Sequence, residues 1–419
     1  MVEILIVIQN IIQYYSLRPL LKHIKKEGLW KFEIVLFDSV KNSTGFREIA
    51  EEAGRKMNED GFEWKSKDIV NGKKCKICLA PYQDMVDVKY DYLIEYYYGS
   101  ASSKPNPTFL PEYKMAFDAV LLHSVYDAEI LSVYSKTYIV PNLRLRKVRR
   151  KLSFNSDKKT LLYLPTYGDI NSINDVSQAL KNIKKDYYII TKGHHGTEYL
   201  LAEGKNKDLV MNISDEYYGP SKDINELFER VDLVLSDNSG AIFDSMYTGI
   251  PVCIMAKDIN KKLGDMNTLQ YRMVQDGIIP YSPKSDYQIL SKLLFETLKP
   301  NVIKRQKEVA KNLFPNKTGG VKAWVKVLEK YMKDEINTDY IKLHRYYTVR
   351  NQENEKLIPY LKEQNKNYKT ELDRLNHELS EKNNKLRLME LENNSYKNGK
   401  LYKLANKIYK IKEGNFRNG

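Results

Sequence analysis

The sequence is poor in cysteine and has no long apolar run. Three cysteines in 419 residues are too few for a disulfide framework, so we expect a reducing compartment. No stretch of 18 apolar residues occurs, which argues against a membrane-spanning helix. The first ten residues, MVEILIVIQN, lack a basic region and a small-residue cleavage site. We therefore expect them to form a first strand and not a signal peptide.

Acidic residues are fewer than basic ones. The chain has 68 Lys and Arg against 54 Asp and Glu, a formal net charge of +14. This excess calls for an anionic partner: nucleic acid, an anionic membrane or a phosphorylated substrate. We expect no nucleic-acid partner, because no recognised binding module accompanies the charge.

The cysteines are also too sparse for a metal site. Cys75 and Cys78 form a single CxxC pair, whereas a structural zinc ion takes four ligands and the other two cannot be placed. We interpret the pair as two small thiols on a turn or strand, and expect no metal.

The stretch from 223 to 255 follows the order helix, strand, polar turn, helix, strand. This order predicts a parallel sheet with crossover helices, in which ligands bind beyond the carboxyl ends of the strands. The polar turn carries Asp237, Asn238, Ser239 and Gly240. The N–H groups that open its helix could hold a phosphate or diphosphate. The same residues also suit an ordinary N-capped helix.

Similar patterns run through the first 334 residues. The expected strands are 4–8, 33–37, 92–94, 119–122, 138–140, 160–164, 187–191, 231–235 and 252–255. The expected helices are 17–26, 45–57, 124–134, 174–183, 224–231, 241–247, 287–297, 302–312 and 320–332. We predict two Rossmann-like domains, residues 1–150 and 151–334, that face a cleft suited to a transferase site.

Two polar segments follow predicted strands in this pattern. Lys192, His194 and His195 lie between two glycines on the loop after 187–191. A histidine there could act as acid, base or hydrogen-bond donor to phosphate; a plain surface loop is the alternative. The segment Glu95–Pro111 also follows an apolar strand, where α/β proteins often place functional loops.

A basic segment separates the two predicted domains. Six of the eight residues from Arg144 to Lys151 are Lys or Arg. The segment could bind phosphates or a membrane surface, or it could be a solvated linker.

The composition changes after residue 335. Residues 360–394 contain no glycine and carry a seam of apolar residues with spacings of 3, 4 and 7. The seam consists of Tyr368, Leu372, Leu375, Leu379, Leu386 and Met389. It predicts a short coiled coil and self-association; a single helix packed against the body is the alternative.

A basic tail ends the chain after a break at Asn398 and Gly399. Between Ser395 and Gly419 there are seven Lys or Arg and one Glu. The helical pattern over 400–412 places apolar residues on one face and lysines on or beside the other. These lysines are Lys400, Lys403, Lys407 and Lys410. Such a helix is typical of an anionic membrane surface; a solvated basic tail is the alternative.

Four segments of the second domain resemble motifs of one family and occur in the family's order. They are LLYLPTYGD (161–169), IITKGHHGT (189–197), DINELFERVDLVLSDNSGAIFD (223–244) and GIPVCIM (249–255). Over about 160–260 the chain thus resembles the CDP-glycerol glycerophosphotransferases, the teichoic-acid primases and polymerases of GT-B fold. The third segment is the longest and most specific match.

The resemblance implies a donor site for a nucleotide diphosphate. His194 would contact or protonate the leaving phosphate, and Ser239 and Gly240 would hold the diphosphate. The residues expected on the donor side are Lys192, His195, Thr166, Asp237, Asn238, Ser239, Gly240 and Asp244. Donors of this kind stabilise a departing phosphate without a metal, and we expect no cofactor because the nucleotide is a substrate.

Three positions depart from the family pattern. Tyr98 stands where the first-domain HGTplK motif has its histidine, Gly168 replaces the arginine after PTY, and Asn238 replaces a tyrosine. A neutral phenol is a poor base near pH 7, so His123 or Glu95 could serve instead. The catalytic candidates are His194, Tyr98 and His123.

These observations predict an α/β transferase of GT-B type with a helical, coiled-coil extension over 335–419. It would move a glycerophosphate-type or glycosyl group from a nucleotide-activated donor, CDP-glycerol by preference, to a lipid-linked polymer such as teichoic acid or capsule. We expect it in the cytoplasm, peripheral on the inner face of the cell membrane. The rivals are a nucleotide-sugar glycosyltransferase or 2-epimerase-like enzyme of the same fold, and a catalytically degenerate membrane-bound coiled-coil scaffold.

Overall fold

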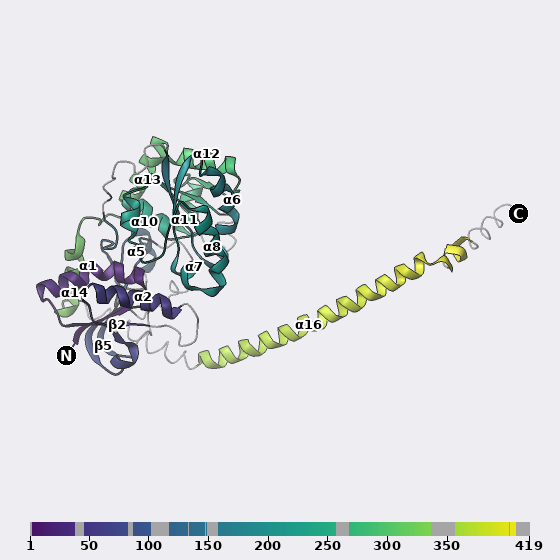
Figure 1. The fold of residues 1–419 in the computed structure, drawn as a ribbon. Helices are drawn as coiled ribbons and strands as arrows, with labels where there is room; N and C mark the ends of the chain where they lie inside the picture. Colours follow the sequence, from purple (N-terminus) through teal and green to yellow (C-terminus); the bar gives the residue numbers. More distant parts are fainter. Residues whose placement is uncertain are drawn as a thin grey trace. The chain divides into compact units, whose positions relative to one another are not determined.

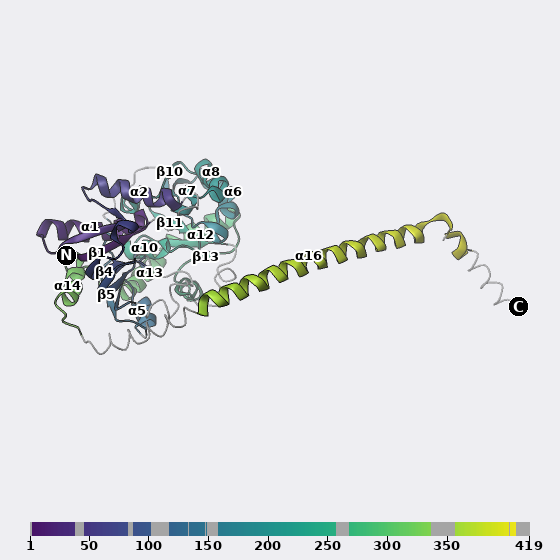
Figure 2. The ribbon, with the colours of Figure 1, turned by 90° about the horizontal axis from the view of Figure 1, so that it is seen from below.

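The structure is a computed structural model that divides into two units, Met1–Tyr346 and Tyr347–Gly419. The residues that it describes are 2–37, 46–82, 87–101, 117–132, 134–146, 148, 158–256, 268–336, 357–401 and 403–407. The first unit holds two parallel sheets with helices on their faces (Figures 1 and 2).

The first sheet has seven parallel strands in the order β3-β2-β1-β4-β5-β6-β7. They are β1 (Val2–Ile8), β2 (Phe32–Leu36), β3 (Lys65–Ser66), β4 (Lys74–Ala80), β5 (Lys89–Tyr96), β6 (Ala119–Leu122) and β7 (Thr137–Ile139). The order reverses between β1 and β4, which is where a doubly wound sheet opens a ligand crevice.

The second sheet has six parallel strands in the order β10-β9-β8-β11-β12-β13. They are β8 (Lys159–Leu164), β9 (Tyr187–Lys192), β10 (Glu216–Tyr218), β11 (Leu233–Ser236), β12 (Val252–Met255) and β13 (Tyr281–Ser282). Its order reverses between β8 and β11, so the turn after β11 lies at the switch point. The predicted fold class, two Rossmann-like sheets of GT-B type with C-terminal helices, is confirmed.

Helices cover both faces of each sheet, and four buried apolar clusters fill the spaces between. In the first half they are α1 (Ile11–Glu27), α2 (Phe46–Glu59), α3 (Lys67–Val70) and α5 (Val125–Leu131). In the second they are α6 (Ile173–Ile183), α7 (His195–Tyr199), α8 (Gly204–Ile213), α9 (Ile224–Phe228), α10 (Ala241–Thr248), α11 (Leu269–Gln275), α12 (Tyr287–Thr297) and α13 (Pro300–Leu313). Two short 3₁₀ turns, Gly168–Ile170 and Leu201–Glu203, join them.

Helix α1 begins six residues earlier than the sequence pattern predicted. The Asn10 side chain accepts hydrogen bonds from the N–H groups of Ile12 and Gln13, so it caps the helix directly after β1. The helix ends at Gly28, whose φ of 62° is a left-handed conformation that glycine adopts without strain. The early cap brings the start of α1 to the carboxyl end of the first sheet.

Strand β4 was missed because lysines interrupt its apolar pattern. Cys75 and Cys78 lie on it, and both thiols are free and buried. Burial raises the pKa of Cys75 to about 11, as expected for inert core thiols. Among the described residues no group of His, Cys, Asp and Glu is arranged to hold a metal.

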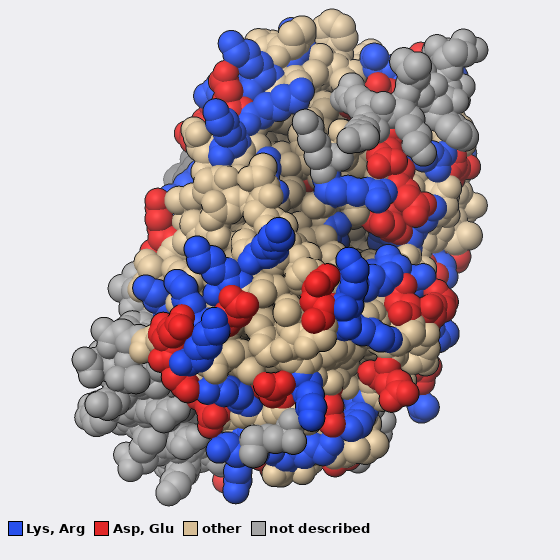
Figure 3. Space-filling view, turned by 90° about the vertical axis from the view of Figure 1, so that its left-hand side faces the viewer, with Lys and Arg blue, Asp and Glu red and all other residues tan. Residues whose placement is uncertain are grey.

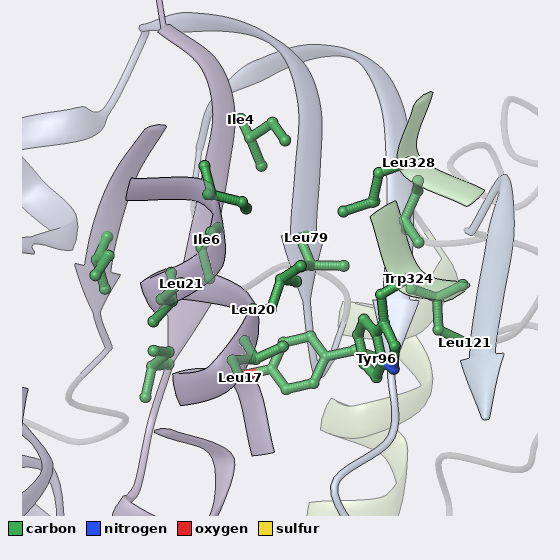
Figure 4. Close-up of a cluster of buried hydrophobic side chains, with 14 of the residues drawn as sticks. Ile4, Ile6, Leu17, Leu20, Leu21, Leu79, Tyr96, Leu121, Trp324 and Leu328 are labelled. Carbon is green, nitrogen blue, oxygen red and sulfur yellow. The ribbon is translucent and has the colours of Figure 1, made fainter. Parts of the chain in front are cut away.

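Helix α14 (Gly320–Met332) returns to the first sheet, although it follows the second sheet in the chain. It lies beside α1 (Figures 1 and 2), and the fully buried Trp324 joins the first apolar cluster (Figure 4). The indole Nε1 also donates to the Pro141 carbonyl at 2.8 Å. The limits of the second domain, 151–334, remain a prediction. Residues 320–332, however, pack against the first sheet, because their apolar face joins its buried cluster.

Charges are mixed on the side of the molecule that carries α1 and α14. Over the face drawn in Figure 3, Lys and Arg alternate with Asp and Glu. Arg18 and Lys22 of α1, for example, both pair with Asp60. The positive net charge is therefore not gathered there.

The second unit contains the long helix α16 (Leu357–Asn398). Its seam residues Leu372, Leu375, Leu379 and Leu386 are about half exposed, so the predicted pairing with a second helix stays a prediction. The helix ends at Asn398, where the break was predicted, and residues 400–401 and 403–407 are again helical. No helix in the described part of the chain has the length and apolar character needed to cross a membrane.

We predict that Trp324→Ala lowers the free energy of unfolding by about 3–5 kcal/mol, because it leaves a large cavity and an unpaired carbonyl. The measurement is the denaturant midpoint of the full chain. Lys326→Ala, an exposed change on the same helix, should alter stability by less than about 0.5 kcal/mol. Equal midpoints for the two variants would show that α14 is not part of the first core.

Candidate active site between the two sheets

A cleft of about 570 Å³ lies where the carboxyl ends of the two sheets face each other. The first sheet contributes α1 and the loops after β4 and β5, and the second contributes the loops after β8, β9 and β11. Both sheets thus bring their strand ends to one space, as the sequence predicted.

The carboxylate of Asp237 holds two of these loops together. It accepts hydrogen bonds from the Thr166 N–H at 2.9 and 3.1 Å, and from the N–H and hydroxyl of Ser172. Asp237 is fully buried and does not line the cleft. It fixes the loop after β8 against the turn after β11, which is a positioning role.

The turn after β11 presents Ser239 and Gly240 to the cleft at the start of α10. The N–H groups of these two residues donate no hydrogen bond within the described part of the chain. The neighbouring Asn238 is 2% exposed and bonds to Ile170 and Gln270. Two free donors at the positive end of a helix suit an anionic oxygen.

The His194 ring is held in one orientation. Its Nδ1 accepts a hydrogen bond from the Gly196 N–H at 3.1 Å. The neutral ring therefore carries its proton on Nε2 and can donate it to a ligand oxygen. Tyr167 stacks on the ring with centroids 4.5 Å apart, and the ring of His195 lies 4.0 Å away.

The two glycines around the histidines are needed for close packing. A Cβ on Gly196 would lie 2.4 Å from the Tyr167 ring, and one on Gly193 would lie 2.3 Å from the Tyr217 hydroxyl. Neither site has room for a side chain. The stacking of Tyr167 on His194 therefore depends on glycine at 196.

Lys192 is a buried cation at the end of β9. Its Nζ donates to the Pro220 carbonyl at 3.0 Å, and the residue lines the cleft. Burial, together with the nearby Arg144, lowers the pKa of Lys192 to about 8. The ammonium is costly to bury, so an anion in the cleft would be strongly attracted to it.

Arg144 and Asp244 form a buried ion pair at the edge of the cleft. The Asp244 carboxylate also accepts from the Ser100 hydroxyl at 2.7 Å, and the Asn142 amide donates to that hydroxyl at 3.1 Å. The loop after β5, the segment between the sheets and α10 are thereby joined. Arg144 Nε has no hydrogen-bond partner in the described part of the chain.

The first-sheet side of the cleft carries Tyr98 but not His123. The Tyr98 and Tyr82 hydroxyls lie 3.1 Å apart, and Glu95 lines the same side. Both nitrogens of His123 face backbone carbonyls, those of Val140 and Tyr97, and burial lowers its pKa to about 4. His123 is outside the cleft and cannot reach a substrate there.

Part of the chain that lines the cleft is similar to known proteins. Residues 138–266 match the family model described as CDP-Glycerol:Poly(glycerophosphate) glycerophosphotransferase. This match covers less than a third of the chain. The teichoic acid poly(glycerol phosphate) polymerase of Bacillus spizizenii is 27% identical over 132 residues, which are 28% of this chain and 31% of that protein. The match thus spans less than a third of that relative.

Solved structures extend the likeness of the fold beyond the glycerophosphotransferase domain. The wall teichoic acid polymerase TagF gives a TM-score of 0.51 at 14% identity, over 80% of this chain and 90% of that chain. A Listeria monocytogenes protein described as a UDP-N-acetylglucosamine 2-epimerase gives 0.52 at 10%, over 80% and 97%. At such identities both comparisons show the fold alone, and they confirm its GT-B-like character.

Most of the residues that the sequence predicted at the site meet in the cleft. Those that line it are Tyr98, Thr166, Lys192, His194, His195, Ser239, Gly240 and Asp244. Asp237 and Asn238 support the turn from behind, and His123 lies elsewhere. Of the tail lysines, Lys400, Lys403 and Lys407 are exposed, and Lys410 lies outside the described residues.

Several cleft residues were given no role in the sequence analysis, among them Tyr15, Tyr82, Tyr167, Lys222 and Asp223. Tyr167 lies within the PTY segment. Its ring packs against Gly196, so this glycine is the feature of the sequence that could have indicated the contact. Lys222 and Asp223 also line the cleft, but a short loop before a helix gives no sign of where it folds. Arg144 was noted only as part of a basic segment.

We predict that Gly196→Ala destabilises the protein by about 1–3 kcal/mol, because its Cβ must displace the Tyr167 ring. The measurements are thermal unfolding and the NMR shift of the His194 ring protons, which should lose the effect of the stacked ring. Gly204→Ala is the matched control, since nothing lies within 4 Å of its added Cβ. Equal effects of the two changes would rule out a packing role for Gly196.

Proposed function

We propose that the protein is a transferase that uses CDP-glycerol as donor and passes glycerol phosphate to an acceptor hydroxyl. The main support is the convergence of Lys192, His194 and the open turn at Ser239 and Gly240 in one cleft. This arrangement belongs to the domain that matches the glycerophosphotransferase family.

The donor diphosphate would lie against the second sheet. Lys192 supplies a positive charge, Ser239 and Gly240 supply N–H donors, and His194 supplies the Nε2 proton. All three kinds of group are fixed before a ligand arrives, so they can stabilise charge on the departing phosphate without rearrangement.

The reaction would be a direct displacement at phosphorus. The acceptor oxygen forms a bond to the phosphorus that carries glycerol, and the bond from that phosphorus to the CMP oxygen breaks. CMP leaves with the electron pair, and His194 donates to its oxygen. The acceptor proton passes to a base on the first-sheet side, where Glu95 and Tyr98 line the cleft.

A lipid-linked acceptor suits the C-terminal tail. Lys400, Lys403 and Lys407 are exposed, as are Leu401 and Leu404. A helix with this composition binds anionic membrane surfaces. We propose that the tail holds the enzyme at the membrane, where the acceptor polymer would be assembled.

We predict that His194→Ala lowers the rate of CMP release from CDP-glycerol by a hundredfold or more, because the leaving phosphate loses its donor. The assay measures CMP formation by the full chain with a lipid-linked acceptor. CDP-ribitol and UDP- and GDP-sugars are run in parallel to define the donor. Near-normal turnover would remove His194 from the mechanism, and no turnover of CDP-glycerol by the wild type would reject this donor.

We also predict that affinity for CDP falls about tenfold between pH 7 and pH 9. The Lys192 pKa of about 8 lies below the usual value, so the side chain is charged below pH 8 and neutral above it. Titration calorimetry over this range measures the effect. Lys192→Arg should flatten the profile, since a guanidinium stays charged; an unchanged slope in that variant would assign the pH dependence to another group.

A further inference from the structure

Helix α16 exposes an apolar seam along its length. The helix has 42 residues (Figures 1 and 2). Along the seam the exposed fraction runs from 48% at Leu375 to 66% at Met389. A helix in a protein gains most of its stability from packing its apolar face. The seam of α16 therefore calls for a partner.

The seam is narrow. Leu372, Leu379 and Leu386 recur every seven residues, at the heptad position named a. Leu375 and Met389 lie three residues after, at position d. The residues on either side of the seam are polar: Glu371, Asn376, Glu378, Asn383, Lys385 and Glu390. A helix that packs on a globular body has a wider apolar stripe, whereas a stripe of a and d positions alone is typical of a coiled coil. A second copy of α16 supplies the matching seam.

The polar residues beside the seam are complementary to themselves. In a parallel pair with the two helices in register, Lys385 faces Glu390 of the second copy. Neither side chain has an ion pair within the described part of its own chain. Glu371 and Glu378, by contrast, both pair with Arg374 of their own helix, and they face asparagines of the second copy. The described flanks thus bring no like charges together and add an attractive contact on each side of the pair.

Two polar residues lie within the seam itself. Asn393 occupies the a position after Leu386. In a parallel pair it meets Asn393 of the second copy, and one amide can donate to the other. An asparagine at position a is a common means of fixing the register of a coiled coil. Lys382 occupies a d position and lowers the stability of the pair without changing its register.

We propose that α16 pairs in parallel with α16 of a second copy of the chain, and that the pair brings two basic C-terminal segments to one membrane surface. The basic segment follows α16 directly in the sequence, so both copies of it leave the same end of a parallel pair. Its described lysines, Lys400, Lys403 and Lys407, are exposed. Two weak membrane contacts on one assembly bind more tightly than one. The membrane part rests on the role proposed above for the tail, whereas the pairing does not.

Sedimentation equilibrium of the full chain tests the pairing, and we expect a dimer at micromolar concentration. Leu379→Gln should raise the dimer dissociation constant about a hundredfold, because both copies lose an apolar contact in one layer. Leu388→Gln is the matched control, since Leu388 is 61% exposed and Leu379 58%, but Leu388 lies outside the seam. It should change the constant by less than about twofold. A wild type that stays monomeric, or equal effects of the two changes, overturns the proposal.

A charge swap tests the parallel orientation. Lys385→Glu should weaken the dimer about tenfold, because it sets two carboxylates against each other on both sides of the pair. Adding Glu390→Lys to this variant should restore the wild-type constant, since the two positions then attract each other again. A double variant as weak as Lys385→Glu alone would show that positions 385 and 390 do not face each other, and it overturns the orientation.

Vesicle binding tests the membrane part. On vesicles of equal parts phosphatidylglycerol and phosphatidylcholine, the wild type and Leu388→Gln should bind about tenfold more tightly than Leu379→Gln. All three proteins carry the same net charge, so equal binding would show that pairing does not couple the tails, and it overturns this part.

The donor assay separates the pairing from the transfer reaction. A dimer that releases no CMP from CDP-glycerol would reject the proposed donor and keep the pairing. A monomeric wild type that releases CMP would keep the transferase and reject the pairing.

Discussion

The buried ion pair between Arg144 and Asp244 is the constraint on which the site depends. Asp244 lies in the first turn of α10 and also accepts from Ser100, which follows β5. Arg144 lies on the segment that joins the two sheets. A buried pair adds little net stability, but the loss of one partner leaves a costly unpaired charge. The pair therefore fixes how the strand ends of the two sheets meet.

The Arg144–Asp244 pair holds together two halves of the cleft that differ in chemistry. The second sheet places fixed donors and cations at its switch point, held by Asp237 from behind. The first sheet places hydroxyls and a carboxylate opposite them. The cleft thus offers groups that stabilise an anion on one side and groups that can accept a proton on the other. Both sets are held in place before a ligand binds.

The sequence predicted best those elements whose bounds depend on residues close together in the chain. Strand β12 and helices α12 and α14 have the predicted bounds, since apolar periodicity and caps mark them. Gly193 and Gly196 flank the histidines for a reason that lies in distant residues, Tyr217 and Tyr167. Contacts between residues far apart in the chain depend on the fold. In the sequence only the glycine that makes room for the contact is visible. The same limit applies to His123, whose strand-end position resembles that of a base although its ring faces backbone carbonyls.

The sequence predicted that Tyr98 stands where the resembled family has a histidine, and the surroundings of Tyr98 bear on that prediction. A histidine there would act as the base itself, whereas the Tyr98 hydroxyl pairs with that of Tyr82 and belongs to an aromatic wall. The carboxylate nearest in sequence, Glu95, lines the same half and accepts protons more readily than a phenol near neutral pH. A tyrosine in place of a histidine removes a cation-forming group from the first-sheet half of the cleft and adds ring surface. The departure at Tyr98 therefore alters the chemistry of this half, and it leaves Glu95 as the carboxylate that lines it.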